Sequence, residues 1–462
     1  MTFYYKFKNK KVAVLGLGVE GEATVDFLLE EKAVVFVFDE KKEDDFNPAK
    51  LRKYKKTGVQ FIFGPFGDLT SFDMIVRSPG VNPSIVNLEK ARQKGIPVTT
   101  GIDIFLNITP GVTLGITGTK GKGTTSTLIY EMLKREKNEV FLGGNIGTPP
   151  LSFLKKLTPL STVVLELSSF QLFDVTKSPN IAVVLMVTSE HMDFHASEEE
   201  YTLAKANILK FQKLGDAAVI NADYENSKRI GEIARVPVYW LSRKKRVSPG
   251  TYVENGAVFF VGLDGKKEKI IEASEIFIPG EHNLENVCAA VAAAKIAGIS
   301  NASITNVLKI FKGLKYRLQF IREVKGVRYY NDSFGTTPES AIAAIRAFMG
   351  PKILILGGSN KNSDFKELAR TISEDKMIRA IIGIGVEWPK IKQEIKEALR
   401  LTGVLQPKII EGCNSMQTIV VAAAKLAHTG NVVILSPACA SFGMFKDYKD
   451  RGNQFDEAVL KL

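Results

Sequence analysis

Cysteine is scarce in this chain, which holds three cysteines among 462 residues. They are Cys288, Cys413 and Cys439, and no two of them have the spacing of metal ligands. An odd number of distant cysteines argues against a disulfide framework and favours a reducing compartment.

Long apolar runs are also missing. The longest, such as Ile181–Val187, fall far below the roughly 18 residues that a membrane-spanning helix needs. The basic and aromatic segment Met1–Lys11 leads directly into a strand rather than into the apolar core of a signal peptide. We therefore expect a cytoplasmic protein without a membrane segment.

An excess of one charge is present but modest, with a formal net charge of +12. Basic residues are scattered among acids, as in Lys41-Lys42-Glu43-Asp44-Asp45, and no basic stripe alternates with aromatic residues. The charge fits either attraction for anionic ligands or a solvated lysine-rich surface. A nucleic-acid-binding ATPase would exploit such a charge, but no recognisable binding module is present, and we expect no nucleic-acid partner.

What the chain does have is an alternation of short apolar strands with amphipathic helices, which is typical of parallel α/β domains. The segment Asn107–Gly111 has the composition of a linker, and Asn255-Gly256 and Asp264-Gly265 are hairpin turn signals. We predict an α/β fold of three domains: a Rossmann-like domain over residues 1–108, a central P-loop-type domain over 109–312 with a mostly parallel sheet and a small antiparallel β portion, and a Rossmann-like α/β domain over 313–462.

A glycine motif, Gly16-Leu17-Gly18-Val19-Glu20-Gly21, lies between the first predicted strand and helix. Its glycines permit a tight turn and the close approach of a diphosphate to the helix N-terminus. Asp39, at the end of the next strand, lies where a dinucleotide fold carries its ribose-binding acid. These residues alone fit NAD(P), a nucleotide sugar or a purely structural turn.

A second glycine-rich segment, Gly115–Thr125, follows the strand at Val112 and precedes a helix predicted at Ser126–Lys134. Such a loop cradles phosphate oxygens with its amides, and Lys122 can reach the β- and γ-phosphates. It is a variant of the P-loop because Gly123 replaces the hydroxyl residue that normally holds Mg²⁺. Thr124 or water would have to substitute.

Three further residues are candidates for the same site. Glu166 ends a buried strand beside the phosphate loop, where a metal-binding acid belongs. His191 follows the strand Ile181–Val187, at another strand end of the same domain. Lys205 lies on a helix that begins with a capping-box pattern, and by itself it would be a surface lysine.

Five motifs occur in an order that resembles the Mur ligases over essentially the whole chain: Gly118–Lys122, Gly144–Gly147, Leu165–Leu172, Glu190–Asp193 and His282–Asn286. Some of them recur in folylpolyglutamate synthases. The C-terminal segments Ser436–Phe442, Phe445-Lys446 and Arg451–Asn453 resemble the members of the family that add D-glutamate.

The resemblance implies an ATP-dependent amide ligase that adds D-glutamate to UDP-N-acetylmuramoyl-L-alanine through an acyl phosphate, in cytoplasmic peptidoglycan precursor synthesis. ATP and Mg²⁺ would be the cofactors, and we expect a monomer. A uridine diphosphate would then occupy the N-terminal glycine turn in place of NAD(P).

The resemblance also implies a role for individual residues. Lys122, His191 and Lys205 would be catalytic, with Lys205 carbamylated, and Asn145 would hold the acceptor substrate. The uridine diphosphate would contact Gly18, Val19, Asp39, Ser78, Pro79 and Gly80. ATP would contact Gly118, Thr119, Lys120, Gly121, Lys122, Gly123, Thr124, Thr125, Asn286, Arg317 and Asp332. Magnesium would be held by Thr124, Glu166, His191 and Lys205, and the incoming amino acid by Thr336, Lys361, Ser441, Phe442 and Tyr448.

The sequence departs from the family pattern at three positions. Gly123 replaces the usual Ser or Thr, and Met186 stands where an asparagine usually precedes Val-Thr. Phe334 occupies the place of a lysine in the common Asn-Asp-Ser-Lys motif. The lost cation bears on one phosphate or carboxylate contact and on the choice of amino acid.

Overall fold

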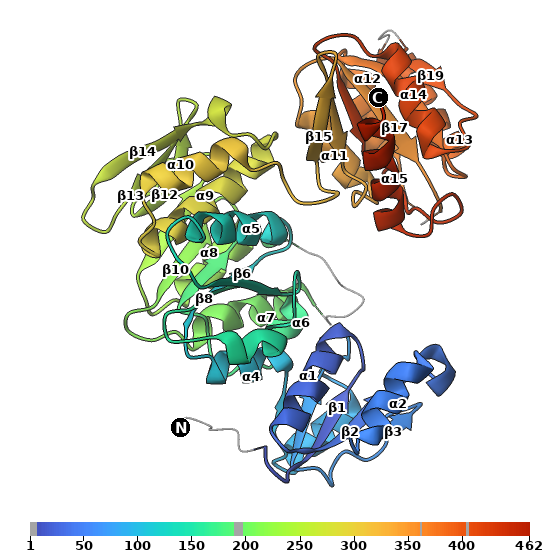
Figure 1. Ribbon diagram of the computed structural model, residues 1–462. Coiled ribbons are helices and arrows are strands. Elements are labelled where there is room, and N and C mark those ends of the chain that lie inside the picture. Colours follow the sequence, from blue (N-terminus) through green and yellow to red (C-terminus); the bar gives the residue numbers. More distant parts are fainter. Residues whose placement is uncertain (1–6, 189–196, 361–362, 403–405) are drawn as a thin grey trace. The chain divides into compact units, whose positions relative to one another are not determined.

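The chain folds into two compact units in a computed structural model that describes residues 7–188, 197–360, 363–402 and 406–462. Unit 1 comprises Met1–Ser274 and Leu284–Val307, and unit 2 comprises Glu275–Asn283 and Leu308–Leu462. Unit 1 contains two sheets and unit 2 contains one, each covered by helices (Figure 1). The predicted α/β class is confirmed.

The first sheet of unit 1 has the strand order β3-β2-β1-β4-β5, and all its neighbours are parallel. The order reverses between β1 and β4, and in open parallel sheets ligands bind at such a reversal, beyond the carboxyl ends of the strands. The elements are β1 (Lys11–Leu15), α1 (Val19–Glu30), β2 (Val34–Asp39), α2 (Pro48–Lys56), β3 (Gln60–Phe63), β4 (Met74–Arg77), α3 (Val86–Gln93), β5 (Val98–Thr99) and α4 (Gly101–Ile108).

The second sheet of unit 1 has nine strands in the order β14-β13-β12-β11-β10-β9-β6-β8-β7. Only the pairs β12–β13 and β13–β14 are antiparallel, so the predicted antiparallel portion extends the parallel sheet. The elements are β6 (Val112–Thr117), α5 (Lys122–Leu133), β7 (Val140–Gly144), β8 (Thr162–Glu166), α6 (Ser169–Leu172), β9 (Ile181–Val184), α7 (Glu198–Lys210), β10 (Ala217–Asn221), α8 (Glu225–Glu232), β11 (Val238–Ser242), β12 (Gly250–Glu254), β13 (Ala257–Val261), β14 (Lys267–Glu272), α9 (Glu281–Ile296) and α10 (Asn301–Ile310).

The sheet of unit 2 has the order β15-β16-β20-β17-β18-β19, and only β15–β16 is antiparallel. The elements are β15 (Gln319–Val324), β16 (Val327–Asn331), α11 (Pro338–Arg346), β17 (Lys352–Gly357), α12 (Lys366–Glu374), β18 (Ile378–Ile384), α13 (Trp388–Thr402), β19 (Lys408–Ile410), α14 (Met416–Leu426), β20 (Val432–Leu435) and α15 (Tyr448–Leu460).

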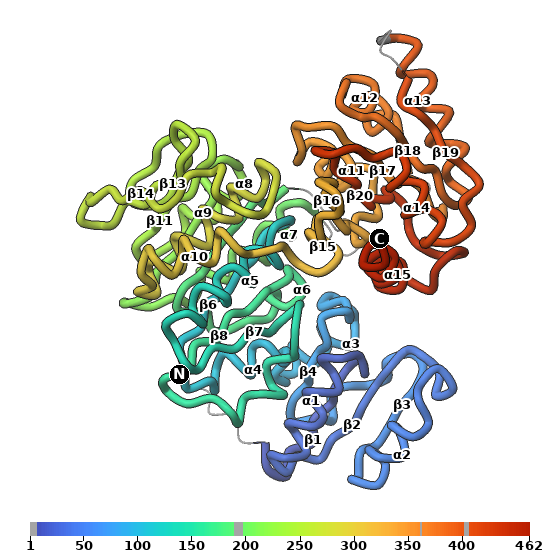
Figure 2. The backbone as a smooth tube through the Cα atoms, turned by 45° about the horizontal axis from the view of Figure 1, so that its top comes forward, coloured from blue at the N-terminus to red at the C-terminus, as the bar shows by residue number. Residues whose placement is uncertain are grey.

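The central strands are continuous apolar runs because helices cover both of their faces. In β8, for example, Val163, Val164 and Leu165 are fully buried. Figure 2 shows the tube of α5 beside β6 and β8, so the helix that follows the phosphate loop packs directly on this core.

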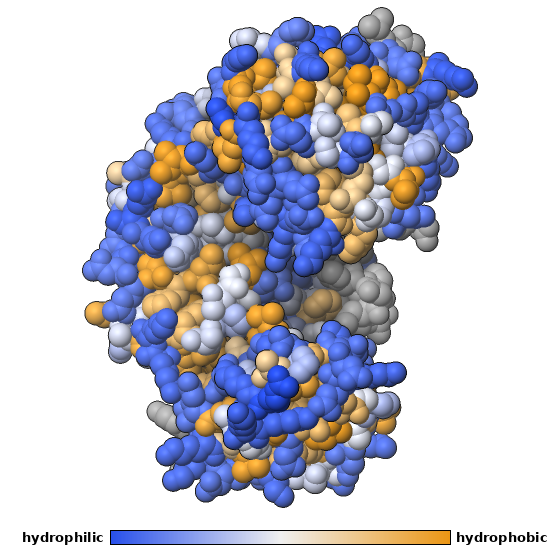
Figure 3. Space-filling model, turned by 45° about the vertical axis from the view of Figure 1, so that its right-hand side comes forward, coloured by the Kyte–Doolittle hydropathy of each residue, from blue (hydrophilic) through white to orange (hydrophobic). Residues whose placement is uncertain are grey.

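Figure 3 shows hydrophilic side chains over most of the face in view, with apolar side chains scattered between them. Within the part of the chain that the structure describes, no helix combines the length and apolar character that crossing a bilayer requires.

Candidate functional site

The N-terminal glycine motif forms the turn from β1 into α1. Gly16 has a φ of 85°, and a Cβ added to Gly21 would lie 2.0 Å from the carbonyl oxygen of Gly16. The turn therefore closes on itself at Gly21, where only glycine fits. The helix begins at Val19, and no described side chain caps its N-terminus. The first amides of α1 are thus available to an anion.

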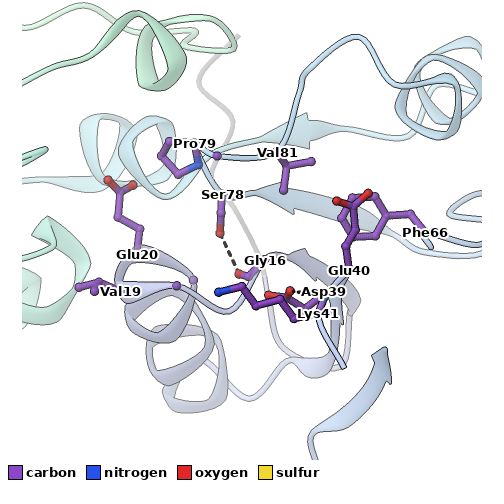
Figure 4. A pocket seen from close by; sticks show the side chains of 13 residues that line it. Gly16, Val19, Glu20, Asp39, Glu40, Lys41, Phe66, Ser78, Pro79 and Val81 are labelled. Carbon is purple, nitrogen blue, oxygen red and sulfur yellow. Dashed lines mark hydrogen bonds between the residues drawn. The ribbon is translucent and has the colours of Figure 1, made fainter. Parts of the chain in front are cut away.

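A pocket of about 470 Å³ lies over this turn (Figure 4). Asp39 accepts hydrogen bonds from the backbone N–H of Leu17 at 2.8 Å and of Lys41 at 3.0 Å. The Ser78 hydroxyl donates to the Gly16 carbonyl at 2.8 Å. The pocket brings together all six residues predicted to contact the uridine diphosphate, and it adds Gly16, Glu20, Gly21, Glu40, Lys41, Phe66 and Val81.

Arg77 is a positioning residue that sequence reasoning missed. Its fully buried guanidinium donates to the carbonyl of Val81 at 2.7 Å, to the carbonyl of Phe170 at 2.8 Å and to Asp174 at 2.9 Å. Burial lowers the pKa of Arg77, and the charge of Asp174 opposes that shift. Arg77 therefore ties the pocket wall after Ser78 to the segment after β8.

The phosphate loop is shorter than predicted. Strand β6 ends at Thr117 and α5 begins at Lys122, so the predicted helix start at Ser126 is wrong. Glycine and threonine are poor helix formers, and tertiary packing overrides that preference here. Gly121 is the N-cap with a φ of 88°, and a Cβ there would lie 2.2 Å from Asn286 Oδ1. The loop thus touches Asn286, another residue predicted to bind ATP.

Two lysine amines converge on this loop. Lys122 Nζ donates to the carbonyls of Gly118 and Thr119, both at 2.9 Å. Lys205 Nζ donates to the same Gly118 carbonyl at 3.0 Å and lies 4.4 Å from the centre of the Tyr201 ring. Lys205 is only 1% exposed, so the interpretation as a surface lysine is wrong.

The segment after β9 is bonded to the same loop. The Thr119 N–H donates to the Met186 carbonyl at 2.7 Å, and the Thr119 hydroxyl donates to the Thr188 carbonyl at 3.0 Å. Met186, which replaces the family asparagine, offers the loop its backbone oxygen. His191 lies outside the described residues, as does Lys361.

Glu166 ends β8, which pairs directly with β6. It is 3% exposed, and its Oε1 accepts a hydrogen bond from Asn145 Nδ2 at 2.8 Å. Its Oε2 is buried without a hydrogen-bond partner. Asn145, predicted to hold the acceptor substrate, thus also orients this carboxylate.

An unpartnered buried carboxylate oxygen is costly unless a cation or donor satisfies it, and Mg²⁺ prefers such oxygens. Glu166 therefore fits the predicted magnesium site. Thr124 lies in the first turn of α5, the helix that follows β6, and β6 is the strand that pairs with β8. The described residues contain no cluster of three or more His, Cys, Asp or Glu that could hold a metal by itself.

Unit 2 has its own polar site, where β16 and β20 end side by side. Asp332 accepts hydrogen bonds from the Ser436 hydroxyl at 2.6 Å and from the Leu318 N–H at 3.1 Å. Burial raises the pKa of Asp332 to about 7, and these hydrogen bonds oppose the shift. Arg317 and Asp332 belong to unit 2, whereas Asn286 belongs to unit 1.

Arg451 anchors the loops that follow β16 and β20, although no individual role was predicted for it. The buried guanidinium donates to the Ser333 carbonyl at 2.8 Å and to the Cys439 carbonyl at 3.1 Å. Burial lowers the pKa of Arg451 to about 10. The second loop also contains Ala438, whose φ of 61° is strained, and the buried Ser441, a predicted amino-acid contact.

Phe334 does not leave its surroundings without a cation. The guanidinium carbon of Arg317 lies 3.9 Å from the centre of the Phe334 ring. The edge of that ring meets Tyr448, with the two ring centres 5.1 Å apart. Two more predicted contacts, Thr336 and the largely exposed Phe442, belong to the loops after β16 and β20. An aromatic platform carries Arg317 at this position.

Mostly parallel sheets, an uncapped glycine loop with a lysine at the helix start, and an acid on the neighbouring strand define an α/β protein with a candidate phosphate-binding loop. Three family models match consecutive parts of the chain. "Mur ligase MurD-like, N-terminal domain" matches residues 10–100, "Mur ligase middle domain" matches 116–294, and "Mur ligase, glutamate ligase domain" matches 316–439.

Curated relatives match over their whole length. The UDP-N-acetylmuramoylalanine--D-glutamate ligase of Acetivibrio thermocellus is 38% identical over 100% of this chain and 98% of its own. The protein of the same name from Geobacillus kaustophilus is 37% identical over 99% of this chain and 98% of its own. The chain belongs to the Mur ligase family.

Solved structures share the fold. UDP-N-acetylmuramate-alanine ligase MurC from Thermotoga maritima matches with a TM-score of 0.59 at 18% identity, over 98% of this chain and 100% of that one. MurF ligase from Thermotoga maritima, solved with ADP, matches with a TM-score of 0.57 at 19% identity, over 99% and 96%.

Proposed function

We propose that this chain is an ATP-dependent amide ligase that joins D-glutamate to the carboxylate of UDP-N-acetylmuramoyl-L-alanine in peptidoglycan precursor synthesis. The relatives of that name, similar over the whole chain, support this activity. The observation that carries it is the juxtaposition of the Lys122 loop with Glu166 on neighbouring strands. A triphosphate and a divalent cation are needed at one place, and this sheet edge suits both.

We propose three functional domains with boundaries at residues 1–108, 109–312 and 313–462. The three family matches, one within each range, support this division. The first domain would bind the uridine diphosphate through the amides of the turn into α1 and the pocket over it. Asp39 and Ser78 act there by holding the turn in shape.

The central domain would bind ATP. The uncapped first turn of α5 presents backbone N–H groups to phosphate oxygens, and the Lys122 amine exchanges its loop carbonyls for the β- and γ-phosphates. Asn286, in contact with Gly121, borders the same loop. Arg317 and Asp332 stay predicted ATP contacts within unit 2. Gly118, Thr119, Lys120, Gly123, Thr124 and Thr125 complete the proposed phosphate contacts.

Magnesium would be held by Glu166 together with Thr124, His191 and a carbamylated Lys205. Bound there, it neutralises the repulsion between the substrate carboxylate and the triphosphate. The side-chain amide of Asn145 donates to Oε1 of Glu166, so Oε2 of this carboxylate stays available. The buried amine of Lys205 is fixed beside the loop, which suits a residue that works inside the site.

The reaction proceeds in two displacements. The carboxylate of the alanyl substrate attacks the γ-phosphorus, the bond to ADP breaks, and an acyl phosphate forms. The amino group of D-glutamate then attacks the acyl carbon and loses a proton to solvent, an amide forms, and inorganic phosphate leaves with the bonding electrons. Lys122 and the loop amides stabilise the charge that develops on the transferring phosphoryl group.

The C-terminal domain would position D-glutamate through Thr336, Lys361, Ser441, Phe442 and Tyr448. Arg451 fixes the loop that carries Ser441, and Arg317 on the Phe334 ring supplies a cation near Tyr448. This cation stands in for the lysine that the family pattern has at position 334. Removing the ring should therefore raise the KM for D-glutamate or for ATP.

The test is a phosphate-release screen with ATP, Mg²⁺, UDP-N-acetylmuramoyl-L-alanine and single amino acids. We expect turnover with D-glutamate and little with the other amino acids. Turnover with another amino acid alone would reassign the selectivity, and none with any of them would reject the ligase. We also propose a monomeric, cytoplasmic enzyme; light scattering during size-exclusion chromatography tests the oligomeric state.

A further inference from the structure

The pocket over the N-terminal glycine turn has a charge that does not suit a diphosphate. Glu20, Asp39 and Glu40 all line it, and Lys41 alone is basic among the described lining residues. Three carboxyl groups and one amine should repel an anion rather than attract it. At least part of this negative charge must be neutralised when a nucleoside diphosphate binds in the pocket.

Two of the three carboxyl groups have an evident arrangement. Both oxygens of Asp39 accept hydrogen bonds from the backbone N–H groups of Leu17 and Lys41, which stabilise its charge. Glu40 is exposed and can turn toward solvent. Glu20 differs because it is held in place: Gln171 Nε2 donates to its Oε1 at 2.5 Å.

Glu20 also occupies the position where the diphosphate is expected. It is the second residue of α1, in the uncapped first turn beside Gly21. Figure 4 shows it rising from α1, whereas Asp39 and Lys41 come from the end of β2. An ionised carboxylate here would compete with the ligand for the amides of the helix N-terminus.

The nearby arginine does not neutralise Glu20 fully. Arg77 is engaged by Asp174, by the carbonyl of Phe170 and by the carbonyl of Val81. Burial raises the pKa of Glu20 to about 7, against smaller opposing effects of the Gln171 hydrogen bond and the Arg77 charge. The carboxyl group therefore gains and loses its proton close to neutral pH, before any ligand is bound.

We propose that Glu20 takes up one proton from solvent when the diphosphate of UDP-N-acetylmuramoyl-L-alanine enters this pocket, and that the neutral carboxyl group then donates a hydrogen bond to a phosphate oxygen. Because Gln171 already donates to Oε1, the new O–H forms on Oε2 and is free to face the ligand. Protonation thus replaces the repulsion between the Glu20 carboxylate and the diphosphate with a hydrogen bond. The inference rests on the proposed function for the identity of the ligand.

The consequence is an affinity that depends on pH in a defined direction. Above pH 7 the free carboxyl group is ionised, so binding must pay for its protonation, and the affinity should fall toward about tenfold per pH unit. Below pH 6 the proton is already present and the affinity should level off. The ligand itself is a diphosphate diester with one carboxylate, and neither group titrates between pH 6 and 9.

The experiment is a calorimetric titration of UDP-N-acetylmuramoyl-L-alanine, without ATP, into the full chain in buffers of different ionisation enthalpy. For a free carboxyl group of pKa about 7, we expect uptake of about 0.9 proton per ligand at pH 8 and about 0.1 at pH 6. Binding without uptake at pH 8 would overturn the proposal. The absence of any binding would instead count against the proposed function.

Variants assign the proton to one residue. Glu20→Gln keeps an acceptor for Gln171 and offers a permanent N–H donor, so uptake should fall below about 0.2 proton and the affinity should become flat with pH. The matched control is Glu22→Gln in the same helical turn, because Glu22 pairs with Lys50 at 2.5 Å and lies outside the pocket lining. It should keep the wild-type uptake.

If proton uptake in Glu20→Gln equals that of the wild type, another group takes up the proton and the assignment to Glu20 is rejected. If that variant does not fold, as judged by circular dichroism, Gln171→Leu decides. It removes the hydrogen bond that favours the ionised form, so the free carboxyl group is protonated at higher pH and the uptake at pH 8 must decrease. Uptake that stays the same or increases there would reject the proposal.

Discussion

Unit 1 uses the same backbone device twice, and the two copies differ in charge. Each consists of a parallel strand, a glycine turn and a helix whose N-terminus no described side chain caps, at Gly18 in one and at Gly121 in the other. The N-terminal turn is bordered by Glu20 and Asp39, whereas the phosphate loop receives the amines of Lys122 and Lys205.

The backbone of each turn offers amides to an anion, and the surrounding side chains would then select which anion binds. A triphosphate carries more charge than a diphosphate diester and transfers a phosphoryl group, so the proposed ATP site would use the two lysines and the oxygen of Glu166. A diphosphate that only anchors the substrate needs no such excess of positive charge. Its pocket accommodates acids that would repel a triphosphate.

Lys122→Ala should cause the greatest loss of activity. Removing the amine leaves the phosphate loop with amides alone, like the N-terminal turn, and phosphate release should fall by at least about 1000-fold. Steady-state phosphate release measures the loss, and circular dichroism verifies the fold. The control is Lys134→Ala, an exposed lysine at the far end of the same helix, which should retain nearly full activity. Normal turnover in Lys122→Ala would remove the loop from the site.

Lys205→Ala should have the next largest effect, about 100-fold on kcat, because this buried amine is fixed on the Gly118 carbonyl. If the working form is a carbamate, added short-chain carboxylic acids should restore part of the activity. Lys210→Ala, at the exposed end of the same helix, should lose little and respond to no acid. A loss that no acid restores would limit Lys205 to holding the loop.

The glycines test whether the two turns are equally strict. Gly121→Ala forces a Cβ to within 2.2 Å of Asn286 Oδ1 at a φ of 88°, and Gly21→Ala forces one to within 2.0 Å of the Gly16 carbonyl. Each should lower stability by about 2 kcal/mol or more. Gly18 has open space and an ordinary φ, so Gly18→Ala should preserve the thermal midpoint. Equal midpoints for all three would show that the turns rearrange easily.

Much of this architecture could be predicted because buried parallel strands are apolar runs and glycine turns lie at fixed places between strand and helix. The α/β class and the hairpin between β12 and β13 followed from such patterns, whereas Ser78, Pro79 and Gly80 of the N-terminal pocket were expected only from the family resemblance. What failed depended on tertiary contacts. The start of α5 at Lys122 and the burial of Lys205 are set by packing that no local pattern reports.

The buried arginines were beyond reach for the same reason. Arg77 and Arg451 look like any other basic residue in the sequence, and only their carbonyl partners in distant segments identify them as anchors. The charge of the N-terminal pocket was also missed, because the motif fixes the glycines and leaves position 20 free. The roles of individual site residues stay predictions until they are tested by substitution.

The two turns should also differ in how they make the stability of the protein depend on pH, although this effect is small. A carboxyl group whose pKa is raised from 4.5 to about 7 on folding binds more protons in the folded state over that window, so the free energy of unfolding falls as pH rises through it and levels off above pH 7. For Glu20, partly screened by solvent, the loss of unfolding free energy should be roughly 2 kcal/mol.

Asp332 adds a loss of the same sign in unit 2. Glu20→Gln should therefore remove only part of the pH dependence of thermal unfolding, and shift the midpoint of unit 1 by a few degrees between pH 5 and pH 8. Lys122→Ala, in the turn without such an acid, should leave that slope unchanged. A Glu20→Gln slope equal to that of the wild type would mean that the carboxyl group is already ionised in the free protein, and the electrostatic contrast between the two turns would then lie in the lysines alone.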